Sequence, residues 1–240
     1  MGTSLAELSF PRKVFLDVGA HDGATLSSVR NPKYGFDWIF CFEPASPCWP
    51  LLEAVHDDRV VVCRFGLWHR TCERPLYDPG SVGASLYADK FKSTPAAEVA
   101  RFVRATDWFR EHVSERDTIY AKLNCEGAEV DIIEDLLESG QFALLRSVVI
   151  DPDIRKIPSQ AHRLRELTER LRASGLTNYA MQEEVMIGNT HRERIEHWLR
   201  VSGAEEPSLG AGVRQLAYLV SEAAHGRGGA LRAAISRRVS

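Results

Sequence analysis

The feature that most constrains the fold is the stretch at residues 14–25, which reads VFLDVGAHDGAT. It starts as a run of apolar, β-favouring residues and then breaks into a turn that contains Gly19 and Gly23. Consecutive apolar residues are typical of a strand covered on both faces, as in a parallel sheet. A helix that opens after Gly23 would direct its free backbone N–H groups back at the turn. The stretch therefore predicts a strand, a turn and a helix beside a carboxylate- or phosphate-bearing ligand.

The spacing of the glycines indicates which ligand this is. A dinucleotide fingerprint reads G-x-G-x-x-G, and its second glycine is bare so that the backbone can touch a pyrophosphate. His21 occupies that position here, whereas a cofactor that brings only an amino-acid end to the turn tolerates an imidazole. Glu43 ends a second apolar run 43 − 23 = 20 residues beyond Gly23, where an acid can reach ribose hydroxyls. We therefore expect S-adenosylmethionine to bind across these two strand ends.

Length and composition are those of an ordinary globular protein. The chain has 240 residues, of which 44% are hydrophobic and 26% charged, and its net charge of −3 gives no general attraction to nucleic acid or anionic membranes. We find no apolar run of membrane-spanning length and no signal-peptide core at the start. Five cysteines without a CxxC pair favour a reducing compartment. We expect a cytoplasmic protein with a small-molecule or glycan partner, and the oligomeric state stays open.

Apolar runs alternate with helix-like segments along most of the chain. The expected strands lie at 14–18, 38–42, 60–65, 118–123, 146–150, 176–181 and 215–220, with a further extended segment at 99–105. Such alternation implies parallel pairing with right-handed crossovers. We therefore predict an α/β fold in which a doubly wound, mostly parallel seven-stranded sheet carries helices on both faces. The hydroxyls of Ser46, Thr106 and Ser159 are expected to cap helices.

The last residues differ from the rest of the sequence. Residues 223–240 contain four arginines and no acid in a background of glycine and alanine. We expect one domain over residues 1–222, followed by a basic tail that is disordered or a frayed helix.

Four motifs together resemble the FkbM-type methyltransferases, a branch of the class I S-adenosylmethionine-dependent, Rossmann-like fold. VFLDVGAHDGATL is similar to the first motif of that family, CFEPASPCWPLL to its acidic ribose motif, and GLWHRTCERPLYDPGSVGASLYADK to its third strand and serine-bearing loop. The most specific of the four, IYAKLNCEGAEVDIIEDLL, resembles a K-x-[DN]-x-E-G-A-E block. The family often has aspartate where this chain has Asn124, and an acid with histidine where it has Asp151-Pro152-Asp153.

The resemblance implies a set of cofactor contacts. The positions around the methionine end are Asp17, Gly19, His21, Asp22, Gly23 and Thr25; Glu43 lies at the ribose, Leu67 near the adenine, and Asn124 and Glu126 in the pocket wall. The family transfers methyl groups mostly to hydroxyls of sugars, glycans and natural products. The resemblance therefore implies an O-methyltransferase.

Methyl transfer to a hydroxyl needs a general base near the strand ends. Glu126 and Asp151 are the residues that we expect to act as base, with Asp153 and His69 as further candidates. We expect no bound metal, because His69 and Cys72 supply two ligands without a third.

Two other functions stay open. A nicotinamide-dependent oxidoreductase could use the same sheet, although His21 argues against it. A non-catalytic module could hold a cofactor or glycan without turnover, and the neutral Asn124 is its best support. A comparison of cofactor binding distinguishes the first alternative, and a methyl-release assay distinguishes the second.

Overall fold

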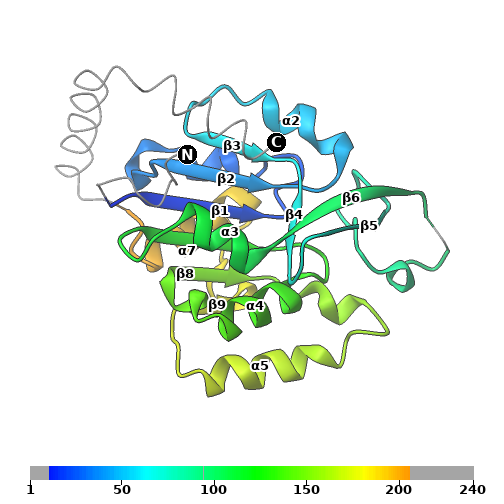
Figure 1. Ribbon diagram of the computed structural model, residues 1–240. Coiled ribbons are helices and arrows are strands. Elements are labelled where there is room, and N and C mark those ends of the chain that lie inside the picture. Colours follow the sequence, from blue (N-terminus) through cyan, green and yellow to red (C-terminus); the bar gives the residue numbers. More distant parts are fainter. Residues whose placement is uncertain (1–10, 94, 206–240) are drawn as a thin grey trace.

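The computed structural model describes residues 11–93 and 95–205, and its centre is a six-stranded sheet (Figure 1). The strand order is β3-β2-β1-β7-β8-β9, and every neighbouring pair is parallel. These strands are β1 (Lys13–Val18), β2 (Trp38–Phe42), β3 (Val60–Cys63), β7 (Thr118–Leu123), β8 (Leu145–Ile150) and β9 (Tyr179–Met181). The first described strand, β1, therefore lies in the middle of the sheet; the next two are added outward to β3, and β7 to β9 follow on the other side of β1. The order reverses between β1 and β7, the place where doubly wound sheets bind ligands.

Helices cover both faces of this sheet (Figure 1). The α-helices are α1 (Leu26–Val29), α2 (Trp49–Glu53), α3 (Ala105–His112), α4 (Glu129–Glu138), α5 (Arg163–Ala173), α6 (Gln182–Val185) and α7 (His191–Val201). Short 3₁₀ turns are η2 (Pro32–Tyr34), η3 (Ser46–Cys48), η4 (Ala88–Lys90), η5 (Gln141–Leu144) and η6 (Asp153–Lys156). None of the described helices is long and apolar enough to cross a bilayer.

The core has two parts because side chains alternate across the strands. Leu16 and Phe40 pack with apolar residues of α3 and α4 on one face. Phe15 and Ile39 pack with those of α1 and α7 on the other. A sheet buried on both faces needs strands without alternation of apolar and polar residues, which is the pattern that the sequence shows.

A second, three-stranded sheet projects from the first (Figure 1). It consists of β4 (Gly66–Trp68), β5 (Cys72–Tyr77) and β6 (Ala97–Arg104) in the order β4-β6-β5. β4 pairs with β6 in parallel, and β5 pairs with β6 in antiparallel. Residues 78–91, called the 78–91 segment below, follow β5 and fold back so that Ser85 pairs with Tyr77.

The number of strands differs from the sequence prediction. The parallel sheet has six strands in the described part of the chain, whereas seven were predicted. The predicted strand at 215–220 and the tail at 223–240 lie outside the described residues. The third strand ends at Cys63 rather than at residue 65, because the chain then turns and enters the second sheet at Gly66.

The three predicted helix caps are also wrong. Ser46 is the first residue of the 3₁₀ turn η3, and its hydroxyl donates to Glu98 Oε2 at 2.5 Å. Thr106 lies within the first turn of α3, and its hydroxyl donates to the carbonyl of Asp135 at 3.1 Å. Helix α5 begins at Arg163 rather than after Ser159. The hydroxyls of Ser46 and Thr106 form tertiary hydrogen bonds instead of capping a helix, and Ser159 lies too far before the first residue of α5 to cap it.

Candidate functional site

A cavity of about 290 Å³ lies where the strand order reverses, at the carboxyl ends of β1 and β7. Its wall is formed by the turns after β1 and β7, the end of β2, strand β4 and the 78–91 segment. Of the predicted site residues, those that line it are Gly19, His21, Asp22, Thr25, Glu43, Leu67, Asn124 and Glu126. Asp17, Gly23 and Asp151 do not line it. The cavity thus brings together residues from four separate parts of the sequence.

The turns after β1 and β7 touch at Gly19. Its φ is +80°, and a Cβ there would lie 1.9 Å from the carbonyl oxygen of Asn124. The backbone N–H of Asn124 in turn donates to the carbonyl of Val18 at 3.1 Å. A glycine is therefore required at position 19 by the approach of the two turns, independently of any ligand.

His21 fills the space above the first turn. Its backbone has a φ of +48°, and its N–H donates to Glu43 Oε2 at 2.7 Å. Its ring Nε2 lies 3.2 Å from the carbonyl oxygen of Gly80 in the 78–91 segment. The imidazole therefore spans from the turn to the opposite wall, in the place where a dinucleotide site keeps open space for a pyrophosphate.

Glu43 is a buried carboxylate at the end of β2, with a relative exposure of 6%. Oε2 accepts from His21 N, and Oε1 accepts from Ala45 N at 2.8 Å. Burial raises the pKa of Glu43, while these two N–H groups favour the charged form. A carboxylate has about four acceptor positions, so lone pairs remain for ligand hydroxyls.

Asp17 and Lys122 form a buried ion pair beneath the cavity. They are register partners in β1 and β7, and Lys122 Nζ lies 3.0 Å from Asp17 Oδ1. The same ammonium donates to the carbonyl of Gly19 at 2.9 Å. Lys122 lines the cavity, although the sequence analysis noted it only as part of a motif. The pair fixes the first residue of the turn.

The turn after β7 is held by Glu129 and presents Glu126 to the cavity. The carboxyl group of Glu129 accepts from the N–H groups of Cys125 and Gly127, each at 2.8 Å. Glu126 has a φ of +55°, which is uncommon for a residue with a side chain. Its carboxylate pairs with Lys90 of the 78–91 segment.

Asp151, the other predicted base, does not line the cavity, and its carboxylate accepts hydrogen bonds from three side chains. Arg155 Nη2 donates to its Oδ1 at 3.1 Å, and Gln182 and Asn124 donate to its Oδ2 at 2.8 Å and 3.3 Å. Asp153 is 1% exposed and binds Lys156 at 2.6 Å. Of the two predicted bases, Glu126 lines the cavity and Asp151 does not.

Two further cavity residues are His191, which none of the four motifs contains, and Ser81, which lies in the third motif without being singled out. His191, at the start of α7, lies with Nε2 3.1 Å from the hydroxyl oxygen of Thr25, 166 positions earlier in the chain. Ser81 lines the cavity with a buried hydroxyl that has no hydrogen-bond partner among the described residues. Only tertiary structure brings these residues to the turn.

His69, a further candidate base, lies away from the cavity with its Nδ1 3.4 Å from Asp131. Within residues 11–93 and 95–205, no group of three or more His, Cys, Asp or Glu side chains is placed to hold a metal ion.

Together the fold and the site define an α/β protein with a doubly wound, Rossmann-like parallel sheet and a cavity at its switch point. No protein-family model and no curated protein matches the sequence. Among solved structures, the chain is similar to the crystal structure of the methyltransferase FkbM from Methylobacillus flagellatus KT, with a TM-score of 0.44 and 15% sequence identity. The similarity covers 72% of this chain and 38% of that chain.

Proposed function

We propose that the protein is a methyltransferase that binds S-adenosylmethionine in this cavity. The observation that carries the proposal is the charge of the wall, which contains the carboxylates of Asp22 and Glu43, and that of Glu126, whose charge Lys90 compensates. Lys122 also lines the cavity, but its charge is compensated by Asp17. A ligand with a sulfonium and an ammonium group suits such a wall, whereas a pyrophosphate would face the carboxylates of Asp22 and Glu43.

The remaining wall residues fit the other parts of this cofactor. The turn from Gly19 to Thr25 and the unpartnered hydroxyl of Ser81 offer polar groups to its amino-acid end. Glu43 offers acceptors to the ribose hydroxyls. Leu67, Leu86 and Phe102 are buried and line the cavity, and they form an apolar surface for the adenine.

Glu126 is the residue that we propose as general base. When bound, S-adenosylmethionine supplies a methyl group on a positively charged sulfur. Burial raises the pKa of Glu126, Lys90 opposes that shift and Asp153 adds to it. A carboxylate with a raised pKa is better suited to take the proton of an acceptor hydroxyl. We infer methyl transfer to a hydroxyl of a sugar, glycan or natural product.

Isothermal titration calorimetry tests the cofactor. We expect S-adenosylmethionine to bind and NADH not to bind, because the ring of His21 fills the position of the pyrophosphate. Glu43→Gln should weaken S-adenosylmethionine binding by about 1.5 to 3 kcal/mol, the loss of a hydrogen bond to a charged acceptor.

The matched control is Glu98→Gln. Glu98 also accepts from a backbone N–H, that of Ser46 at 2.7 Å, but does not line the cavity. Its variant should bind S-adenosylmethionine like the wild type. Binding of NADH alone, or equal affinity of the Glu43 variant and the wild type, would contradict the proposed site.

A further inference from the structure

The 78–91 segment forms the outer wall of the cavity. Four of its residues line the cavity, namely Ser81, Val82, Ala84 and Leu86. Ser85 and Leu86 are buried, whereas the side chain of Val82 is 78% exposed. The position of this segment therefore affects the shape of the cavity. Several contacts hold it, among them the Tyr87 hydroxyl, which donates to Asp131 at 3.1 Å, and Asp89, which accepts from the N–H of Ser159 at 2.8 Å.

Lys90 makes the strongest of these contacts with the site. Its Nζ binds the Glu126 carboxylate and donates to the carbonyl of Gly83 at 2.6 Å. The side chains of Lys90 and Glu126 are only 9% and 12% exposed. The hydroxyl of Ser85 adds a hydrogen bond to the carbonyl of Glu126 at 2.7 Å. Both of these polar contacts between the segment and the turn after β7 are therefore made to Glu126.

The buried Lys90–Glu126 pair should hold the segment in place more strongly than an ion pair at the surface would. An exposed pair is hydrated and contributes little, but a buried charge that loses its partner is strongly unfavourable. Removing either member therefore disfavours the closed arrangement more than removing an exposed charge would.

We propose that Lys90 is a positioning residue that fixes the Glu126 carboxylate at the cavity wall and fastens the 78–91 segment across the cavity. Ligand exchange then requires the Lys90–Glu126 pair to separate. Whether Lys90 holds the 78–91 segment in place can be tested without any ligand. Its effect on Glu126 as general base rests on the proposed function.

Hydrogen exchange of the 78–91 backbone amides, followed by mass spectrometry, measures opening of the segment. Lys90→Met keeps the length of the side chain and removes its charge, so these amides should exchange about tenfold faster or more. Lys90→Arg keeps the charge and should restore slow exchange. Lys92→Met is the matched control, because Lys92 is an exposed lysine two positions away, and it should exchange like the wild type.

A double-mutant cycle distinguishes loss of the Lys90–Glu126 pair from a general destabilisation of the segment. Glu126→Gln should also accelerate exchange, and Lys90→Met/Glu126→Gln should accelerate it by less than the product of the single effects, because it leaves no buried charge unpaired. If Lys90→Met does not fold, the double variant, which has no unpaired buried charge, can be compared with Glu126→Gln instead. Wild-type exchange in a folded Lys90 variant, or independent effects of the two changes, would overturn the proposal.

Stopped-flow binding of S-adenosylmethionine gives the second readout. In Lys90→Met both association and dissociation should be faster than in the wild type, and in Lys92→Met neither should change. If S-adenosylmethionine does not bind the wild type at all, the proposed function fails, whereas the exchange experiment still decides the fastening. If it binds but the Lys90→Met rates equal the wild-type rates, Lys90 does not control ligand exchange.

Discussion

Glu129 is a carboxyl group without solvent exposure, and its ionisation should therefore affect stability. Burial raises its pKa from an ordinary value of about 4.3 to about 8. Between these values the native protein keeps a proton that the unfolded chain has released. The contribution of Glu129 to the free energy of unfolding should therefore fall by up to about 1.4 kcal/mol per pH unit from pH 4.3 to pH 8, with no further change above that range.

Urea unfolding at pH 5 and pH 8 tests this prediction. The difference in unfolding free energy between the wild type and Glu129→Gln should be more favourable to the wild type at pH 5 than at pH 8. Glu138→Gln is the control in the same helix, because Glu138 is 65% exposed, and its difference should not depend on pH in this range. A pH-independent difference for Glu129→Gln would show that Glu129 does not hold a proton in the native state.

At the same scale, the sequence predicted some site residues and missed others for a physical reason. Gly19 and Glu43 follow apolar runs, so their place at strand ends could be predicted from the local pattern. Lys90 and His191 reach the site through contacts with Glu126 and Thr25, 36 and 166 positions away. A pattern of neighbouring residues cannot predict contacts between positions so far apart in the sequence.

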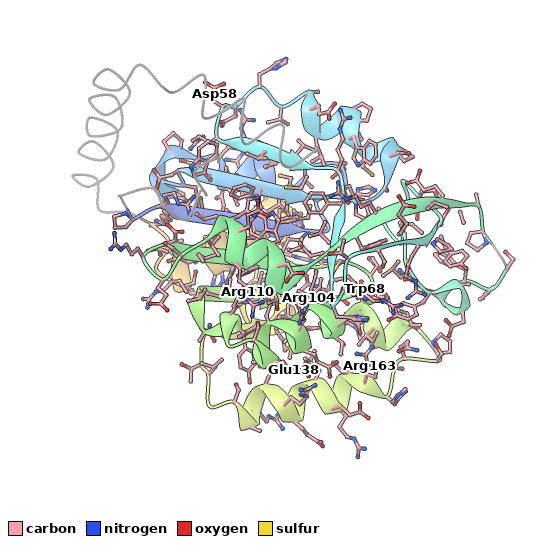
Figure 2. The ribbon with its side chains drawn as sticks, viewed as in Figure 1. Asp58, Trp68, Arg104, Arg110, Glu138 and Arg163 are labelled. Atoms are coloured by element: carbon pink, nitrogen blue, oxygen red, sulfur yellow. The ribbon has the colours of Figure 1, made fainter. Side chains whose placement is uncertain are left out.

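At the scale of elements, α4 connects three parts of the fold through Asp131. This carboxylate accepts from Trp68 Nε1 at 3.0 Å, from the Tyr87 hydroxyl at 3.1 Å and from Arg163 Nη2 at 2.9 Å. Figure 2 labels two of the donors, Trp68 and Arg163. The three donors belong to β4, the 78–91 segment and α5. One side chain of α4 therefore holds the second sheet and the cavity wall against the first sheet.

Asp131→Ala should lower the free energy of unfolding by roughly 2 to 4 kcal/mol, because it leaves the Trp68 and Tyr87 donors without this acceptor and removes one of the two carboxylates that pair with Arg163. The control is Glu138→Ala, which removes an exposed pair with Arg170 from the same helix and should lower it by about 1 kcal/mol or less. Urea unfolding of both variants gives the comparison. Equal effects would mean that Asp131 does not connect these elements.

The elements themselves were predictable to different degrees. β1, β2, β7 and β8 are buried on both faces, so their apolar runs identify them without tertiary information. β5 is a partly exposed strand that contains Pro75, and its sequence therefore has no such run. The separate three-stranded sheet depends on pairing between β5 and β6 across the 78–91 segment, which the sequence alone does not specify.

At the scale of the whole molecule, the beginning and the end of the described residues are in contact. Lys13 Nζ at the start of β1 donates to the carbonyl of Ala204 at 2.6 Å, across 191 positions. Ala204 has no exposed surface and belongs to the core on the α7 face. This contact precedes residues 223–240, for which the sequence predicts no apolar stripe and an excess of arginine.

We therefore expect a chain that ends at Glu222 to keep the cooperative urea unfolding of the full chain, with an unfolding free energy within about 0.5 kcal/mol and the same m value. A chain that ends at Gly203 is the control, because it also lacks the Ala204 carbonyl that binds Lys13. It should lose at least about 1 to 3 kcal/mol, since Lys13 loses this acceptor, the buried Ala204 is removed from the core and the predicted strand at 215–220 is removed as well. A smaller m value or a broad transition in the chain that ends at Glu222 would mean that the basic residues are part of the domain.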